Sequence, residues 1–194
     1  MINKISDNIT FQSKIKFVDH PSFREKVATF GRQNYVDFPW TIKESVMSDK
    51  VYTRGIAVCT SCVLTDGIKA LMLHICPTFD AIKNFQAIEN YIRERFGWDC
   101  SKLKGFLIGA IDEERSLKLH EKFEKFLNKE NIPYSQFKCG DTTVSDVAYS
   151  VKDDEFLISS VLLDDKNRCK ELKTKNMANV LYRDHHICEL DELV

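Results

Sequence analysis

The sequence predicts an α/β, or layered α+β, domain in which a mostly antiparallel or mixed β-sheet core carries two packing helices. Two observations predict this class. Short apolar runs of strand length recur along the chain, and turn residues such as Gly and Asp separate them. Two longer segments, 78–96 and 113–130, instead repeat their apolar residues at helical spacing.

Composition sets limits on function. The 194 residues are 43% apolar and 29% charged, with a formal net charge of -1. Such a chain can form one core of useful size, and it lacks the basic excess that nucleic acid or an acidic membrane surface demands. No run approaches the roughly 18 apolar residues of a membrane span. We therefore expect neither a nucleic-acid partner nor a membrane span.

The cysteines and the N-terminal sequence indicate a location. There are seven cysteines, an odd number, and several lie inside apolar runs. This usage is typical of reduced thiols in the cytoplasm rather than of a disulfide framework. The first residues contain no hydrophobic core of a cleaved secretory signal, although export as an effector by another route is compatible with the sequence.

Residues 1–45 are expected to form an N-terminal extension. Partial alternation of apolar residues predicts a strand within 9–18. Helical spacing predicts a helix over about 23–30, with Gly31 as its stop. The Phe-Pro-Trp sequence at 38–40 predicts a turn.

Residues 46–163 are expected to form the main domain. Its central feature is a pair of apolar strands within 53–77, joined by a turn at 65–67. A helix capped by Thr78 follows, and then a short buried strand at 105–111.

The second half of this domain contains the second helix and three more strands. The strands are expected near 134–138, 147–151 and 155–162, where they would form a β-meander with a hairpin turn at 152–154. After residue 163 the pattern becomes charged and helical, which predicts a C-terminal helical tail over 164–194.

The strand pair within 53–77 carries residues suited to thiol chemistry. Cys59 lies on the first expected strand and His74 on the second, so the two can meet in space. A free thiol, with a pKa of about 8.5, is mostly protonated at neutral pH, and a nearby imidazole can take its proton. The hydroxyl or carbonyl of Thr53 is the candidate to orient that imidazole. Amide N–H groups over 55–58 are candidates to hold a developing oxyanion.

These residues resemble a known family. The motif consists of Thr53, Gly55, Cys59, Leu64, Asp66, His74 and Pro77. It is similar to that of the CheD chemoreceptor glutamine deamidases, which carry Thr-x-Gly-x-Gly-Ser-Cys, an Asp further on, and a His followed by a Pro. The 15 residues from Cys59 to His74 are fewer than is typical of CheD, and similar to the spacing in the catalytic domains of cytotoxic necrotizing factor and Burkholderia lethal factor. The chain departs from CheD at residues 57–58, which are Ala-Val rather than Gly-Ser.

The resemblance implies a CheD-like deamidase fold and the activity of a protein-glutamine deamidase, which is a hydrolase. Such an enzyme has a cysteine nucleophile and uses no cofactor and no metal. Its partner would be a protein substrate that presents an exposed glutamine. Cys59 would attack the side-chain carboxamide, His74 would protonate the departing ammonia, and Thr53 would hold the histidine. The toxin domains in the comparison imply an effector or toxin as readily as a chemotaxis enzyme.

Other interpretations stay open at this point. The Thr-Ser-Cys sequence at 60–62 also resembles the Ser-Cys of the family, but strand alternation places Cys59 and Cys62 on opposite faces, and Cys59 keeps the better spacing. The cysteines and His74 are also compatible with plain core packing in a non-catalytic interaction module. Cys59, Cys62, His74 and Cys76 together could instead form a small zinc-binding module.

Overall fold

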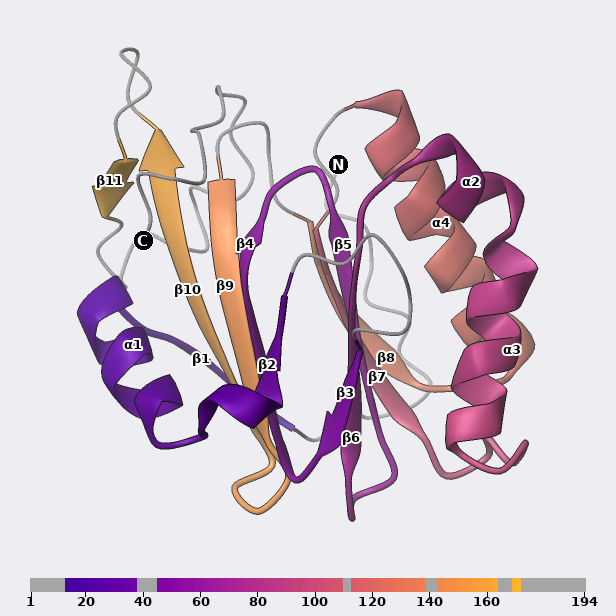
Figure 1. Cartoon of the computed structure of the whole chain (residues 1–194), viewed down its shortest axis with the longest axis horizontal. Helices are drawn as coiled ribbons and strands as arrows, with labels where there is room; N and C mark the ends of the chain where they lie inside the picture. The colour runs from indigo at the N-terminus through magenta and orange to yellow at the C-terminus, as the bar shows by residue number, and fades with distance from the viewer. Residues whose placement is uncertain (1–12, 38–44, 110–112, 139–142, 164–168, 172–194) are drawn as a thin grey trace.

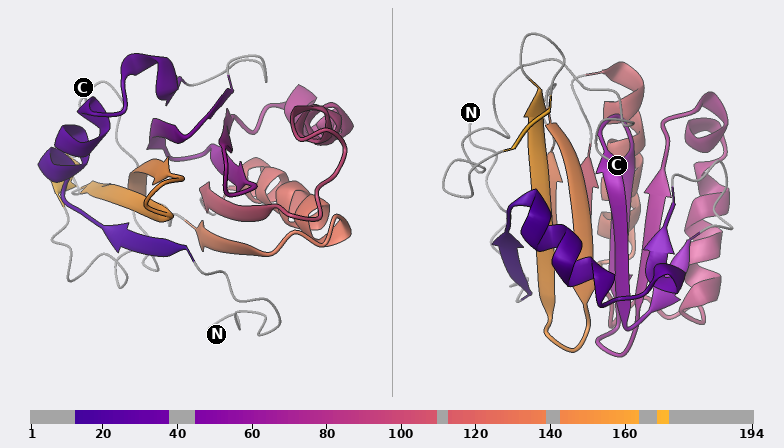
Figure 2. Two further views of the ribbon diagram at one scale, coloured as in Figure 1. Left: turned by 90° about the horizontal axis from the view of Figure 1, so that it is seen from below. Right: turned by 60° about the vertical axis from the view of Figure 1, so that its left-hand side comes forward.

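The computed structural model describes residues 13–37, 45–109, 113–138, 143–163 and 169–171. Two β-sheets pack face to face, and helices cover their outer faces (Figures 1 and 2). The layers therefore run from helix α1, through sheet A and sheet B, to helices α2, α3 and α4.

Sheet A has the strand order β1-β10-β9-β4-β2, and β11 also pairs with β10. Its strands are β1 (Lys14–Phe17), β2 (Tyr35–Val36), β4 (Lys50–Ile56), β9 (Thr143–Ser150), β10 (Glu155–Leu163) and β11 (Cys169–Glu171). The β9–β10 hairpin is antiparallel and turns at 151–154, which includes the turn expected at 152–154. β1 pairs in parallel with β10, and β2 pairs in parallel with β4.

Sheet B has the strand order β3-β6-β5-β7-β8. Its strands are β3 (Val46–Ser48), β5 (Thr60–Thr65), β6 (Ala70–Ile75), β7 (Lys104–Gly109) and β8 (Tyr134–Lys138). β5 pairs antiparallel with both β6 and β7. β8 lies parallel to β7, because helix α4 carries the chain back across the sheet between them.

The helices begin and end largely where the sequence predicts. They are α1 (His20–Ala28), the 3-10 helix η1 (Arg32–Asn34), α2 (Phe79–Lys83), α3 (Phe85–Arg95) and α4 (Glu114–Lys129). The Asp19 side chain caps α1 by accepting the Ser22 N–H at 2.7 Å, and Thr78 caps α2. The single helix expected over 78–96 is interrupted at Asn84, so it forms two shorter helices.

Two main cores hold the layers together. Between the sheets, Phe156 stacks on Tyr149 at 4.3 Å and contacts Phe106 of sheet B at 4.5 Å, measured between ring centroids. The other core fills the space between sheet B and helices α2–α4. Strands β5 and β6 are buried on both faces, which explains why neither sequence alternates between apolar residues and exposed polar residues.

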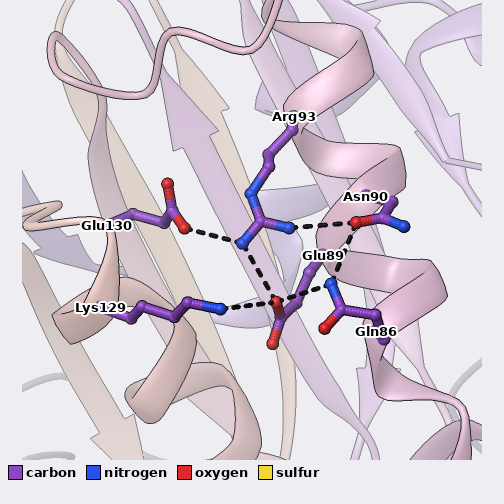
Figure 3. Close-up of polar contacts among 6 residues, drawn as sticks. All are labelled: Gln86, Glu89, Asn90, Arg93, Lys129 and Glu130. Carbon is purple, nitrogen blue, oxygen red and sulfur yellow. Dashed lines mark hydrogen bonds and ion pairs between the residues drawn. The ribbon is translucent and has the colours of Figure 1, made fainter.

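A polar network joins α3 to the end of α4 (Figure 3). Arg93 on α3 donates to Glu130 at 2.7 Å and to Glu89 at 3.1 Å, and Lys129 lies 3.7 Å from Glu89. The Arg93 guanidinium also lies over the Phe126 ring, 5.3 Å from its centroid. The pKa of Arg93 is raised, chiefly by its bond to Glu130.

The expected mixed α+β architecture is confirmed, but its arrangement differs in two respects. The expected single sheet is two sheets, and the expected β-meander is wrong, because β8 belongs to sheet B whereas β9 and β10 belong to sheet A. The pattern of apolar residues marks each strand but does not mark its partner.

The expected chain divisions also change. Residues 14–36, expected in an N-terminal extension, supply β1, α1 and β2 to sheet A and its cover, so they are an integral part of the domain. Residues 169–171, expected in a helical tail, form strand β11. The turn expected at 38–40 and the rest of the tail lie outside the described residues.

Candidate functional site

The candidate site lies where the chain passes from sheet A to sheet B. β4 ends at Ile56, a bend covers 57–59, and β5 begins at Thr60 in the other sheet. Cys59 therefore lies in a bend and not within a strand, which corrects the expectation of one continuous strand. The register between β4 and β9 shifts between Thr53 and Ile56, where Gly55 has φ 73°.

Thr53 and His74 meet across the space between the two sheets. Thr53 comes from β4 and His74 from β6, and both side chains are fully buried. The Thr53 hydroxyl donates to the Val36 carbonyl oxygen at 2.6 Å. Having given its only hydrogen there, Oγ1 accepts the second bond, at 2.7 Å, from Nδ1–H of His74. This relay selects the imidazole tautomer that has its lone pair on Nε2.

His74 is uncharged at neutral pH. Burial lowers the pKa of His74 to about 4, and the opposite influence of Asp37 and Asp146 is smaller. A neutral imidazole with an oriented ring and a lone pair on Nε2 is the form that can accept a proton.

The register of β5 and β6 places Cys59 close to this histidine. Ser61 lies directly opposite His74, and Thr60 opposite Ile75. Cys59 directly precedes Thr60 and Cys76 directly follows Ile75, so the two cysteines adjoin the last pair of this ladder. Cys59 is therefore only two residues along the chain from Ser61, the residue that lies opposite His74. Cys59 is almost completely buried, with 2% of its surface exposed.

Cys76 is the thiol partner of Cys59, and the sequence analysis missed this pairing. The Cys59 thiol donates a hydrogen bond to the Cys76 sulfur, and together with burial this raises the pKa of Cys59. The same bond lowers the pKa of Cys76 to about 7, against the effect of its own partial burial. Counting outward from the turn between the strands would have found the pair, because both residues are equally far from it.

Cys62 lies on the other side of sheet B. It is fully buried in the core beneath the helices, opposite Leu73 and Leu107, and burial raises its pKa. The expectation that Cys59 and Cys62 face opposite ways stays a prediction, because Cys59 lies in the bend before β5. His74 instead turns toward Thr53 of sheet A, so Cys62 lies on the opposite face of sheet B, and the structure contradicts Cys62 as the nucleophile beside His74 and a zinc site that contains both residues.

Neighbouring elements hold the bend at 57–59 in place. Ser116 of α4 donates to the Val58 carbonyl oxygen at 2.6 Å. Gly109 of β7, with φ 132°, lies so close that an added Cβ would be 2.1 Å from the Cys59 carbonyl oxygen. Helix α4 and strand β7 thus fix the position of Cys59.

Asp146 is a further residue that the sequence analysis did not assign to the site. It is buried, accepts the Gly55 N–H at 2.9 Å, and lies 3.3 Å from His20 and 3.5 Å from Arg54. The Gly55 N–H is therefore occupied in this structure, which contradicts its expected place in an oxyanion site.

Asp66, part of the motif, lies at the far end of the strand pair. Its Oδ1 accepts hydrogen bonds from the N–H groups of Ile68 and Lys69 at 2.8 and 2.9 Å, so Asp66 stabilises the turn between β5 and β6.

Comparisons with known proteins add no identification. The chain matches no protein-family model, and it matches no curated protein. Among the residues that the structure describes, no group of three or more His, Cys, Asp or Glu side chains could hold a metal ion. In the same part of the chain, no helix has the length and apolar character needed to cross a membrane.

Proposed function

We propose that the protein is a cysteine-dependent amidohydrolase that deamidates a glutamine of a partner protein. The observation that carries the proposal is the relay from the Val36 carbonyl through Thr53 to Nδ1 of His74, with Cys59 two residues before Ser61, the residue opposite that histidine. Orientation of the base by a third group is the arrangement that activates a nucleophile. The choice of glutamine is supported by the motif shared with the CheD deamidases.

The reaction would use the side chains as follows. As the Cys59 sulfur attacks the carboxamide carbon, Nε2 of His74 takes the thiol proton. Backbone N–H groups of the bend at 57–59 would hold the oxyanion. His74 then returns the proton to the leaving nitrogen, so that ammonia departs and a thioester remains on Cys59. Water hydrolyses the thioester, which leaves glutamate and restores the thiol.

The resting thiol explains why the base is required. The pKa of Cys59 is raised, so the sulfur keeps its proton until substrate arrives. Proton transfer to His74 must accompany attack rather than precede it. Conversion of a neutral amide into a carboxylate then changes the charge of the target by one unit, which is enough to alter an interface.

A second candidate function is supported by a different observation. Cys59 is only 2% exposed, and a buried, protonated thiol is also what plain core packing produces. A non-catalytic interaction module of this fold is the function that would follow.

The test is to incubate the reduced protein with a cell lysate in water labelled with heavy oxygen. Hydrolysis of a thioester places one heavy oxygen in each new glutamate, so we expect labelled glutamates at former glutamine positions. The variant Cys59→Ser should produce none, whereas Cys62→Ser, matched in burial but packed in the core beneath the helices, should retain the reaction. Absence of labelled glutamates above the Cys59→Ser background would favour the non-catalytic module.

A further inference from the structure

Cys59 and Cys76 form a pair of free thiols at the edge of the candidate site. They adjoin the last pair of the β5–β6 ladder, Thr60 and Ile75, and one thiol donates a hydrogen bond to the other sulfur. We propose that this pair is a redox-active dithiol, a modification site at which a peroxide converts the two thiols into a cross-strand disulfide. The inference goes beyond the proposed function, because disulfide formation requires no deamidase activity.

The geometry suits a disulfide. The cysteines directly adjoin the last pair of the ladder, Thr60 and Ile75, and residues directly opposite in an antiparallel pair have Cα atoms about 4.5–5.5 Å apart. This spacing falls inside the range of about 4.4–6.8 Å that disulfides require. Hydrogen bonding between the thiols shows that the two side chains already point toward each other.

The two cysteines differ in the way that a stepwise oxidation needs. Cys76 is only partly buried, and Cys59 is almost completely buried. The hydrogen bond from Cys59 lowers the pKa of Cys76 to about 7, so much of this thiol is ionised at neutral pH. Burial raises the pKa of Cys62 and of Cys100, which keeps them protonated. Among the four cysteines whose side chains the structure describes, thiolate character and access both select Cys76 as the first sulfur to react.

The oxidation balances with one hydrogen peroxide for each pair. The Cys76 thiolate attacks one peroxide oxygen, the O–O bond breaks, and hydroxide leaves, which gives a sulfenic acid on Cys76. The Cys59 sulfur then attacks the Cys76 sulfur, the S–O bond breaks, and the hydroxyl group leaves as water with the Cys59 proton. Two electrons pass from the sulfurs to the peroxide, and protonation of the hydroxide yields the second water.

One consequence rests on the proposed function. The disulfide would occupy the sulfur that we assign as nucleophile, so oxidation would stop deamidation and a dithiol reductant would restore it. The site would then be active only under reducing conditions.

The experiment treats the full-length protein with one equivalent of hydrogen peroxide, blocks the remaining thiols with N-ethylmaleimide, and maps the tryptic peptides. Cleavage after Arg54, Lys69 and Lys83 separates peptide 55–69 from peptide 70–83. We expect these two peptides to be linked, with the loss of two hydrogen atoms, and to separate again on treatment with dithiothreitol.

Matched variants assign the link to the correct sulfur. Peptide 55–69 contains Cys62 as well as Cys59, so the link should persist in Cys62→Ser and disappear in Cys59→Ser and Cys76→Ser. Thermal melts establish whether each variant is folded. Where a serine variant is not folded, the alanine variant at the same position, such as Cys76→Ala, replaces it.

Two results would overturn the proposal. One is a link that survives in Cys59→Ser, and the other is a folded wild type in which Cys76 is oxidised to a sulfinic acid without any link. Failure of the proposed function gives a different result: the link would still form, but the protein would produce no labelled glutamate. Conversely, a reduced protein that deamidates but forms no link would contradict only the dithiol.

Discussion

Thr53 is the residue on which the candidate site depends most. Its single hydroxyl satisfies the Val36 carbonyl and the Nδ1–H of His74, and so it joins the two sheets while it selects the imidazole tautomer. Thr60 is equally buried, but its hydroxyl has no hydrogen-bond partner among the described residues. The two buried threonines are a matched pair, because the hydroxyl of Thr53 is hydrogen-bonded and that of Thr60 is not.

Thr53→Val should destabilise the protein far more than Thr60→Val. The first change leaves two buried polar groups without their partner and should lower the free energy of unfolding by roughly 2–4 kcal/mol. The second replaces an unsatisfied hydroxyl with a methyl group and should be neutral or slightly stabilising. Urea denaturation of the two variants measures the difference, and equal losses would contradict the assigned hydrogen bonds.

His74 should make stability depend on pH in a defined window. Its pKa is about 4 in the folded protein and 6.5 without the environment of the fold, so the unfolded chain binds the extra proton between these values. Stability from this group is fully present above pH 6.5 and is lost as the pH falls toward 4, by about 3 kcal/mol in all.

The measurement is the free energy of unfolding of wild type and of His74→Gln from pH 7.5 down to about pH 4. The difference between the two should shrink as the pH falls. A difference that is constant with pH would contradict a neutral, buried His74.

At the scale of elements, the bend at 57–59 sets the position of Cys59, and strand β7 packs closely against the backbone of this bend. Gly109 has φ 132° and faces the Cys59 carbonyl oxygen. Gly67, in the turn between β5 and β6, also has a positive φ, of 84°, but no atom lies within 4 Å of an added Cβ. A side chain at Gly67 would therefore meet backbone strain alone, whereas a side chain at Gly109 would meet both strain and a steric clash.

Gly67→Ala should cost about 1 kcal/mol, which is the strain of a left-handed alanine. Gly109→Ala should cost several times more, because the new Cβ would meet the backbone of Cys59 and Thr60. Thermal denaturation of both variants tests this expectation. Similar losses for the two would show that the bend is not held tightly against β7.

The limits of sequence-based prediction are clearest among these elements. The helices near 20–28, 85–95 and 114–129 follow from their periodicity, and most strands follow from their apolar runs. The crossing from one sheet to the other at 57–59 is hidden, because Ile56 to Cys59 is apolar and contains neither Gly nor Pro. Cys59 and His74 could be proposed from residue type and spacing, whereas Cys76 required the strand register.

At the scale of the whole molecule, four layers enclose the candidate site, and polar links stabilise their outer parts. Arg93 connects α3 with the end of α4, and 12% of its side chain is exposed. Lys118 and Glu114 form an ion pair along α4 instead, but both side chains are more than half exposed. The division into two sheets was not predictable from the strand pattern, because a strand buried on both faces reads the same in either sheet.

Arg93→Met should lower the free energy of unfolding by about 1–3 kcal/mol, because Glu130 loses its partner in a partly buried position. Lys118→Met should change it by no more than about 0.5 kcal/mol, because exposed ion pairs contribute little. Chemical denaturation of both variants provides the comparison. Equal effects would contradict a structural link between α3 and α4.

The most direct test of the central claim is the labelling rate of Cys59 by limiting iodoacetamide, followed by peptide mapping. The reagent presents a carboxamide, as a glutamine side chain does, and the Cys76→Ser background removes the partly buried thiol beside Cys59. We predict that Cys59 is labelled faster than the buried Cys62, and that His74→Ala and Thr53→Val slow this labelling without affecting Cys62. Labelling of Cys59 no faster than Cys62, or at a rate independent of His74, would contradict a catalytic Cys59–His74 pair.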